Sequence, residues 1–573
     1  AVGFQASRYM TTASNTTAIG YLAGGGLGGA TVMTGNDNTL VGASAGLKIT
    51  TGANNVALGA NALDANTTAS NNTAVGFQSL TANTTGTQNI AVGATAGDAL
   101  TEGGYNVAVG YTALGTDTKG SKSVALGNYA LAFQNFTSAT DGFNTAVGHL
   151  AGYQVTTGVQ NTLVGGLAGD SITDADHNTV VGYAALSDNV LGSKSVAIGW
   201  GVLADQNPSS ATDMYNTAVG YNAGRLVTTG IQNTLIGGLA GDAITTGAGN
   251  VAVGASSLTA NTTASNNTAV GLSALHSNTT AADNVAMGYK TLYLNTTGAE
   301  NTALGSFAMN LNTTGANNVA VGRLALRVNT TASNNTAVGF SALTANTTGT
   351  ANVAVGTGAA LACTTANELT AIGSTAGDAV TTGVGNTLIG SRAGVHGVGL
   401  TTGPYNVVVG SYSNTSAVDS SYQIVLGHNV TGNADSSLVF GTGTTDSAIA
   451  FGATSITAPS DIRLKEDIQD EEIGLDFINA LRPVTFLWKK EKDIPSEMKA
   501  YKEGSEERTM NGKHNHGFIA QEVKATIDSY DLKDGFDMWQ EDEQDGRQRV
   551  APSALVPILV KAIQELTARI TTL

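Results

Sequence analysis

The chain is poor in the residues on which an ordinary globular core is built. Only 12 % of its 573 residues are charged, 6 % are aromatic and 7 are proline, whereas 73 are glycine. This charged share is about half that of a typical globular domain. Because 42 % of the residues are apolar, the chain is also too hydrophobic for a disordered segment. Such a composition predicts a repeat fold.

Cysteine is nearly absent, since Cys363 is the only one in the sequence. A single cysteine excludes an intramolecular disulfide framework and a zinc site built from cysteines, and we interpret it as a small buried apolar residue. We expect no metal and no cofactor. Four Gly-Asp pairs lack the spacing of consecutive calcium-binding coils, so we interpret their carboxylates as turn caps. These pairs end at Asp98, Asp170, Asp242 and Asp378.

Basic residues and long apolar runs are also scarce. The formal net charge of −17 argues against a nucleic-acid partner and against binding to an anionic membrane. No apolar run reaches the length of a membrane span, so we expect no membrane insertion. The sequence begins at Ala1 inside a repeat, without an initiator Met or a signal peptide. We therefore expect an N-terminal anchoring part to precede it in a longer protein.

Two kinds of sequence are joined near Ser460. Residues 1–460 contain 10 Lys and Arg and 20 Asp and Glu, against 16 and 23 in the much shorter segment 461–573. Such a change in composition is typical of a domain boundary. We predict three parts: a β-solenoid shaft over 1–430, a shaft end with a linker over 431–459, and a separate domain over 460–573.

The first part is an array with the marker Asn-x-Ala-(Val/Ile)-Gly. Its glycine recurs every 17 residues, without interruption from Gly220 to Gly390. Some intervals are longer, such as the one from Gly127 to Gly148, and they indicate loop insertions on a constant coil. The motif GSKSVA at Gly120 also returns at Gly192. About 24 intervals of ~4.8 Å predict a rod on the order of 115 Å long.

One repeat, Asn72 to Gln88, illustrates the predicted coil. The segment NTAVG has the pattern of a short strand, FQSL that of a second short strand, and TANTTGTQN that of turns. We expect the asparagines of successive coils to stack into a ladder. Ala74 and Val75 point to opposite faces of the strand and both are apolar, so both faces must be covered. The coil interior covers one face, and we expect self-association into a homotrimer to cover the other.

These repeats resemble the left-handed β-roll head repeats of trimeric autotransporter adhesins. Those repeats are shorter, so the match lies in the pattern rather than in the period. Similar arrays are common in phage tail fibres. The resemblance extends over about residues 1–430 and implies a trimeric, mainly β fibre.

The last part contains SDIRLKEDI, ALRPVTFLWKK, HGFIAQEV and LVPILVKAIQEL in this order. It resembles the intramolecular chaperone domain of endosialidases and phage tail fibres, a small α+β domain. The resemblance implies that the domain brings three chains into register and then releases itself by autoproteolysis. The nucleophile would be Ser460, the base Lys465 and the cleaved bond Pro459–Ser460, because a serine hydroxyl needs a base to become nucleophilic.

Other residues of this domain have more than one interpretation. Asp461, His516, Gly517, Gln521 and Glu522 either support the cleavage site or the trimer contact, or form a local structural motif. We interpret Phe486 and Trp488 as core residues of a strand. The final segment has the heptad pattern of a coiled coil, which we assign to the trimer. Its a and d positions are Val556, Leu559, Ile563, Leu566, Ile570 and Leu573.

We therefore expect a phage tail fibre that attaches the virion to a bacterial surface receptor, such as a polysaccharide or an outer-membrane component. The receptor-binding tip would be near 405–459, where Tyr405, Tyr412, Tyr422 and Phe440 occur. Two alternatives are a bacterial trimeric surface adhesin and a polysaccharide-depolymerising tailspike. Paired carboxylates beside aromatics, which such a depolymerase needs, are not evident in the array, so we expect no external substrate.

Overall fold

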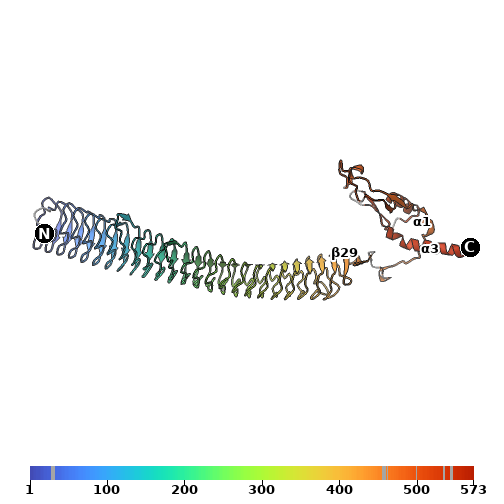
Figure 1. Ribbon diagram of the computed structural model, residues 1–573, viewed down its shortest axis with the longest axis horizontal. Coiled ribbons are helices and arrows are strands. Elements are labelled where there is room, and N and C mark those ends of the chain that lie inside the picture. The colour runs from blue at the N-terminus through green and yellow to red at the C-terminus, as the bar shows by residue number, and fades with distance from the viewer. Residues whose placement is uncertain are drawn as a thin grey trace. The chain divides into compact units, whose positions relative to one another are not determined.

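The computed structural model describes residues 1–26, 32–453, 460, 462–498, 500–510, 512–532, 536–541 and 546–572. The chain divides into two compact units, Ala1–Pro459 and Ser460–Leu573, which we call the shaft and the C-terminal unit (Figure 1).

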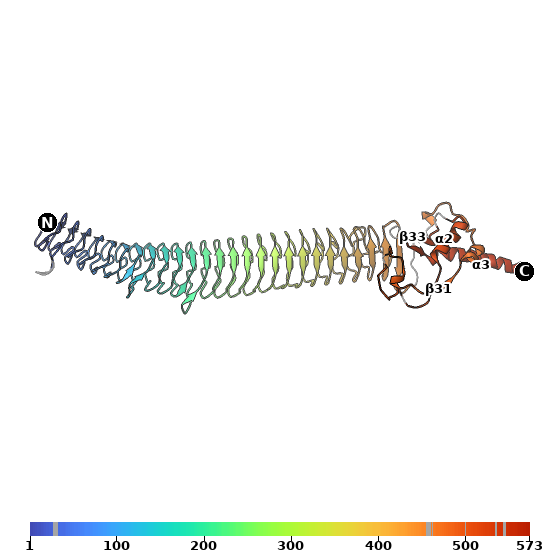
Figure 2. The same cartoon turned by 90° about the horizontal axis from the view of Figure 1, so that it is seen from above.

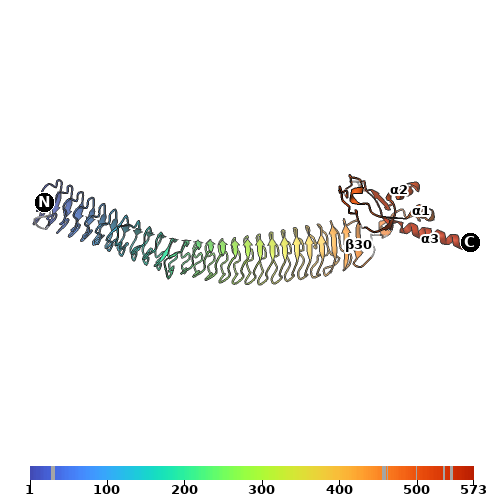
Figure 3. The same ribbon diagram turned by 45° about the horizontal axis from the view of Figure 1, so that its top comes forward.

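The shaft is a β-solenoid of about 24 coils, and each coil contributes one short strand to a continuous sheet. Successive strands pair in parallel and in the same register, so that Thr73, Ala74 and Val75 lie beside Ile90, Ala91 and Val92. Figure 3 shows the strands along one side of the shaft and the connecting segments on the other.

The strands of this sheet are β1 (Thr17–Ile19), β2 (Thr39–Val41), β3 (Val56–Leu58), β4 (Thr73–Val75), β5 (Ile90–Val92), β6 (Val107–Val109), β8 (Val124–Leu126), β10 (Thr145–Val147), β11 (Thr162–Val164), β12 (Thr179–Val181), β14 (Val196–Ile198), β16 (Thr217–Val219), β17 (Thr234–Ile236), β18 (Val251–Val253), β19 (Thr268–Val270), β20 (Val285–Met287), β21 (Thr302–Leu304), β22 (Val319–Val321), β23 (Thr336–Val338), β24 (Val353–Val355), β25 (Thr370–Ile372), β26 (Thr387–Ile389), β27 (Val407–Val409), β28 (Ile424–Gly427), β29 (Ser437–Gly441) and β30 (Asp446–Ala450).

Each strand ends at a glycine that no other residue can replace without strain. Gly76 has φ +138°, and a Cβ atom there would lie 2.3 Å from the carbonyl oxygen of Gly93 in the next coil. The backbones of adjacent coils therefore leave no room for a side chain at this column, which explains the fixed glycine of the repeat.

The segment after this glycine is not a second strand, so that part of the predicted coil is wrong. In this return segment, Gln78 and Leu80 have φ values of +58° and +48°, which lie outside the β region. Their amides alternate in direction: Gln78 donates to Ala60 of the preceding coil, and Leu80 donates to Ala96 of the following coil. The return segment is thus held to both neighbouring coils without β geometry.

The predicted asparagine ladder is confirmed. The Oδ1 atom of Asn72 accepts from the backbone amide of Asn89 at 2.9 Å, and its Nδ2 atom donates to the carbonyl of Gly86 at 3.0 Å. These side chains are fully buried, and the ladder satisfies backbone groups that would otherwise lie unpaired in the coil interior.

A second asparagine ladder was not predicted. It runs inside the coils from Asn261 to Asn346, where Asn312 donates to Asn295 at 2.8 Å and Asn329 donates to Asn312 at 2.7 Å. These are the asparagines of Asn-Thr-Thr triplets, which the sequence places in turns. Cys363 continues this column and is buried, as predicted, and its burial raises the pKa of the thiol to about 11.

A large side chain at one of two core positions of the coil, the strand centre or the return segment, goes with a small residue at the other. Most coils place alanine at the strand centre and leucine in the return segment, as at Ala74 and Leu80. Where the strand centre is leucine, the return segments on both sides have glycine instead: a Cβ at Gly152 or Gly169 would lie 2.6 or 3.0 Å from Leu163. The other such triplets are Gly24, Leu40 and Gly46; Gly224, Leu235 and Gly241; and Gly377, Leu388 and Gly394.

The longer intervals are loops on a constant coil, as predicted. Strand β8 pairs with β10 in unbroken register, Val124 beside Thr145, although the chain between them is longer than one regular repeat. The extra residues pair with the preceding coil through β7 (Gly120–Ser121) and β9 (Thr140–Asp141), and again through β13 (Gly192–Ser193) and β15 (Thr212–Asp213). Both insertions protrude from the same edge of the shaft (Figure 2).

The described end of the shaft is covered by an antiparallel strand. β30 pairs with β29, so the last parallel strand does not leave its edge open. Phe440 lies beside Leu426 of β28 in register and continues a column of the sheet.

The C-terminal unit is a small α+β structure. Its helices are α1 (Leu475–Ala480), α2 (Ala520–Ser529) and α3 (Val556–Thr571), and its antiparallel strand pairs are β31 (Val484–Phe486) with β32 (Asn515–Gly517) and β33 (Trp539–Glu541) with β34 (Gln548–Val550). Short 3-10 turns lie at η1 (Ile462–Leu464), η2 (Glu491–Asp493) and η3 (Pro552–Leu555). Its core contains Phe477, Leu481, Val523, Ile527, Met538, Leu555 and Ile558. Among the described residues, no helix has the length and apolarity needed to cross a membrane.

Candidate functional site

An aliphatic stripe runs along the outer face of the shaft. The central residue of each three-residue strand is buried, whereas the third residue points out of the coil and keeps part of its surface exposed. That third residue is always large and apolar. From β1 to β29 the stripe consists of Ile19, Val41, Leu58, Val75, Val92, Val109, Leu126, Val147, Val164, Val181, Ile198, Val219, Ile236, Val253, Val270, Met287, Leu304, Val321, Val338, Val355, Ile372, Ile389, Val409, Leu426 and Phe440.

This stripe is the uncovered face that the sequence predicts. Leu58, Met287 and Leu304 are 46 %, 42 % and 39 % exposed, although alanine at the centre of the same strands is fully buried. A contiguous apolar surface of this length marks an interaction site. Phe440, interpreted from the sequence as a tip residue, belongs to this stripe.

Ser460 and Lys465 form a contact at the start of the C-terminal unit. The Nζ atom of Lys465 donates to the Oγ atom of Ser460 at 2.8 Å, and both side chains are exposed. The single turn η1 lies between them, and the Lys465 amide closes it by donating to the carbonyl of Ile462 at 3.2 Å. The turn therefore brings two residues five positions apart into hydrogen-bond reach, which is the geometry that a serine nucleophile and a lysine base need. Pro459 and Asp461 lie outside the described residues.

The remaining residues singled out in this unit lie on other elements. His516 and Gly517 are in β32, where His516 pairs with Thr485 of β31. Glu522 in α2 is held by Arg482, whose Nε atom donates to Oε2 at 3.0 Å, and this ion pair lowers the pKa of the carboxyl. Within the described residues, no hydrogen bond or ion pair joins these groups to Ser460 or Lys465.

Gln521 lies on a groove rather than beside Ser460. The groove has a volume of about 500 Å³ and is lined by Gln521, Gly517, Phe486 and Trp488, among others. The rings of Phe486 and Trp488 meet edge to face at 5.3 Å and are half-buried, and neither belongs to the core of the unit. The interpretation of these two aromatics as core residues is therefore wrong.

Helix α3 carries a second uncovered apolar stripe. Ile558 and Ala562 pack into the unit and are buried, whereas the predicted a and d residues point away from it. Val556, Leu559, Ile563, Leu566 and Ile570 are between 40 % and 65 % exposed. Leu573 lies outside the described residues. One helix thus has one face in the core and one exposed apolar face, a pattern that is typical of a coiled-coil seam.

The Gly-Asp pairs form no common site. Their glycines are the return-segment glycines described above or an equivalent position, and their carboxylates lie in separate coils. Burial raises the pKa of Asp98, Asp170, Asp242 and Asp378, and the backbone amides of Asp98 and Ala99 oppose this shift at Asp98. In the part of the chain that the structure describes, no three His, Cys, Asp or Glu side chains are grouped so that they could hold a metal ion.

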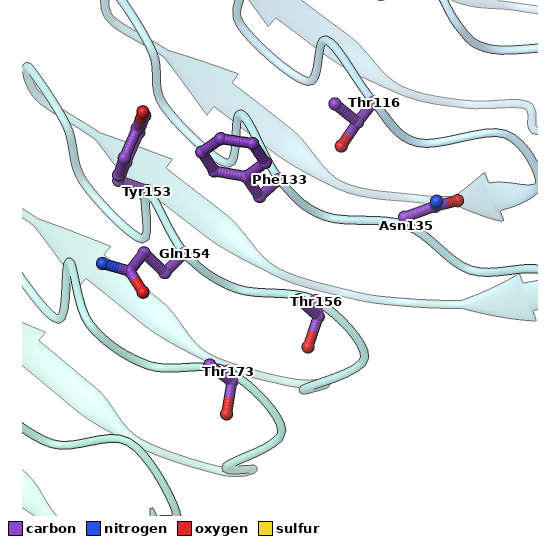
Figure 4. Close-up of a pocket in the computed structure, with 7 residues that line it drawn as sticks. All are labelled: Thr116, Phe133, Asn135, Tyr153, Gln154, Thr156 and Thr173. Carbon is purple, nitrogen blue, oxygen red and sulfur yellow. The ribbon is translucent and has the colours of Figure 1, made fainter.

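Sequence reasoning missed an aromatic groove on the side of the shaft, lined by Phe133 and Tyr153 among others (Figure 4). The signal that could have found it is the concentration of aromatic residues between Tyr111 and Tyr153 next to a coil with an insertion.

Comparison with known proteins identifies the start of the C-terminal unit. Residues 460–532 match the family model described as the chaperone of endosialidase. No curated protein and no solved structure matches the chain. A chaperone domain of this family that follows a long β-solenoid fits a trimeric fibre of the tail-fibre or tailspike kind.

Proposed function

We propose that the chain is the receptor-binding fibre of a phage tail, that it assembles as a homotrimer, and that its C-terminal unit drives assembly and then cuts itself off before Ser460. The single observation that carries this proposal is the aliphatic stripe, because it extends over the whole described shaft and is followed in the sequence by a segment that matches a chaperone of endosialidase.

Self-association would cover the stripe. Three shafts around an axis would bring their stripes together in one common core, and the match to a chaperone domain that fits a trimeric fibre favours this arrangement over a dimer. Each buried aliphatic side chain contributes roughly 1 kcal/mol or more when it leaves water. The exposed seam of α3 would hold three chains together at their C-termini, so that coils of distant sequence then wind in register.

The contact between Ser460 and Lys465 supports self-release. When its amine is neutral, Lys465 can take the hydroxyl proton of Ser460 across the same contact. The Ser460 oxygen then attacks the carbonyl carbon of residue 459, the carbon–nitrogen bond breaks, and the proton passes to the amine of Ser460. Water hydrolyses the ester that results, which leaves a carboxyl group on residue 459 and restores the hydroxyl.

Intact mass spectrometry of the purified chain tests release, and native mass spectrometry tests assembly. We expect wild type to split between residues 459 and 460, and Ser460→Ala and Lys465→Ala to stay whole. Lys489→Ala is the matched control, since this lysine is also exposed and lies in the same unit. Wild type that stays whole, or a Lys465→Ala variant that splits at the normal rate, would overturn the assignment of these roles.

Attachment to the host is tested separately from release. The described end of the shaft carries Tyr405 and Tyr422, whose rings stack at 5.4 Å and are each about half exposed. Trimers that lack residues 405–451 should fail to adsorb to the host. Normal adsorption would move the receptor site elsewhere on the fibre. Hydrolysis of capsule by the purified protein would favour a tailspike, and a secretion signal in the complete protein would favour a bacterial adhesin.

A further inference from the structure

An open groove lies on the side of the shaft, far in sequence from the expected tip. It has a volume of about 540 Å³, which is in the range of small-ligand sites. Its walls come from four consecutive coils, those that follow β6, β8, β10 and β11. The lining residues are Thr116, Phe133, Asn135, Tyr153, Gln154, Thr156 and Thr173 (Figure 4).

Aromatic rings form one wall of this groove. Phe133 and Tyr153 meet edge to face at 4.9 Å, and Tyr129 lies edge to face with Tyr153 at 6.1 Å. Phe133 remains 46 % exposed. Tyr111 extends the cluster to the coil before, with its ring 5.2 Å from that of Tyr129. Rings that hold one another in place offer apolar surface with little loss of side-chain freedom on binding.

The other wall is polar and uncharged. The hydroxyl of Thr156 donates to Asp174 at 2.6 Å, and the hydroxyl of Thr118 donates to Asn135 Oδ1 at 3.2 Å, so both groups are fixed. Within the described part of the chain, the side-chain Nδ2 atom of Asn135 and the side-chain amide of Gln154 have no protein partner. They are available to a ligand as hydrogen-bond donors and, at Gln154, also as an acceptor.

The groove is separate from the aliphatic stripe. Its residues belong to return segments and to the loops that follow them, whose outward side chains leave the coil on a different side from those of the strands. The stripe has the same kind of residue in every coil, whereas the sixth position after the marker glycine holds residues as different as Phe133, Gln154 and Asp188. A constant face suits assembly, and a variable face suits recognition.

We propose that this groove binds a neutral glycan chain lying along the shaft. A sugar ring has an apolar face of C–H groups and a rim of hydroxyls, which complement the aromatic wall and the two amides respectively. None of the seven lining residues is charged, so an anionic or cationic ligand would find no counter-charge among them. Coils spaced by ~4.8 Å present these groups at intervals of about one sugar ring, over a stretch of roughly 14 Å.

Binding rather than hydrolysis follows from the same lining. Glycoside hydrolysis uses a pair of carboxyl groups facing the bond. Asp174, whose carboxylate contacts the lining residue Thr156, accepts hydrogen bonds from the hydroxyls of Thr156 and Thr157. This proposal specifies a ligand for the proposed fibre. It rests on the proposed function, because only a fibre that reaches a cell surface would bring this groove to surface glycans.

The test is binding of the purified full-length protein to an array of bacterial surface polysaccharides and neutral hexose oligosaccharides, followed by calorimetry with the best ligand. We expect a neutral glycan to bind, and Tyr153→Ala or Phe133→Ala to weaken it at least tenfold. Gln154→Ala should weaken it about threefold, and binding should not change between low and high salt. Phe340→Ala is the matched control, because this ring is 48 % exposed elsewhere on the shaft and should not matter.

Two results would contradict glycan binding in this groove but would leave the proposed fibre function intact. One is binding of no glycan on the array, and the other is a glycan that binds Tyr153→Ala and Phe133→Ala as well as wild type. In both cases, adsorption of wild-type trimers to the host would still support the proposed fibre function. Binding of a surface protein in place of a glycan would also contradict the proposal. If wild-type trimers do not adsorb to any host, the fibre role itself fails.

Discussion

A leucine at the centre of a strand excludes a side chain from two neighbouring return segments. Leu163 fills the space that leucine occupies in other coils, and the glycines at 152 and 169 leave room for it. This exchange explains the glycines before Asp170 and Asp242, whose own coils carry the marker Asn-Thr-Leu, and the glycine before Asp378, which packs against Leu388 of the next coil. The glycine before Asp98 packs instead against Leu80 and Leu100.

Gly152→Ala should loosen the coils around it. The new Cβ would lie 2.6 Å from Leu163 Cδ1, and alanine would have to adopt a φ of +60°, which together cost about 2 kcal/mol. We expect hydrogen exchange of the backbone amides near β10 and β11 to accelerate. The double variant Gly152→Ala/Leu163→Ala should lose about 1 kcal/mol less unfolding free energy than the sum of the two single losses, because both side chains compete for the same space. Strictly additive effects would contradict the exchange.

Asp170 should make the shaft less stable at neutral pH than in mild acid. Burial, helped by nearby Asp188, raises the pKa of its carboxyl to about 6. Because the folded state then holds the proton more tightly than the unfolded chain, this stabilisation is present below about pH 4 and is lost as the pH rises through about 6. Asp170→Asn should therefore slow thermal unfolding at pH 7.5, by an effect on the order of 1 kcal/mol after allowance for exposure, and change little at pH 4.

Asp174 supplies the control of opposite sign. The hydroxyls of Thr156 and Thr157 lower the pKa of its carboxyl, so its contribution is present at neutral pH and is lost on acidification. Asp174→Asn should speed unfolding at pH 7.5. If both substitutions act in the same direction at pH 7.5, the electrostatic explanation is wrong.

At the scale of elements, the strand could be predicted and the return segment could not. The alternation in NTAVG and its fixed glycine specify a strand with one face inside the coil, and the predicted second face is the aliphatic stripe. FQSL also alternates, but its backbone takes positive φ at Gln78 and Leu80, a conformation set by contacts with two neighbouring coils rather than by local preference. For the same reason, the sequence of a single repeat does not indicate that the asparagines of the second ladder point into the coil.

The candidate site was predictable only in part. Ser460 and Lys465 were identified through resemblance, since five residues of separation place no constraint on two side chains in an unknown turn. Their 2.8 Å contact depends on the turn η1. The groove lined by Phe133 and Tyr153 could be suspected from the local concentration of aromatics, but its lining could not be predicted, because it combines residues from four coils whose alignment depends on where the insertions leave the coil.

Charges placed on the aliphatic stripe should prevent assembly. Lysine at Val321, Val338 and Val355 would put three cations per chain into the proposed common core, where an unpaired charge costs several kcal/mol. We expect native mass spectrometry to show monomers. The matched control is lysine at Val328, Ala345 and Ala362, in the return segments of the same three coils. Trimers with the stripe variant, or monomers with the control, would place the interface elsewhere.

At the scale of the whole molecule, the proposed function requires the C-terminal unit to fold before the shaft. The coils of the shaft pair in parallel over long loops, which makes their formation slow and dependent on prior register. The C-terminal unit has its own core and an exposed helical seam, so it can form first and bring chains together.

Released shafts should unfold irreversibly. We expect shafts that have lost residues 460–573 to remain trimeric for days in mild denaturant, and to give aggregates or monomers instead of trimers when diluted from full denaturation. Uncleaved Ser460→Ala, which keeps its C-terminal unit, is the control and should refold to trimers in at least a tenfold higher yield. Equal yields, measured by native gel and mass, would remove the chaperone role.

The two insertions have a consequence for the history of the gene. They correspond residue by residue, and the correspondence extends to buried partners: Gln134, Ser123 and Asn144 in the first match Gln206, Ser195 and Asn216 in the second. The interval between them contains four complete coils, from β8 to β14. Because every coil meets the next in the same register, a block of coils can be copied or lost in one recombination event without disturbing either end. Each such event changes the length of the shaft by roughly 19 Å. For the proposed fibre, the distance that it reaches would then be set by the number of coils, with no change in the sequence of any coil.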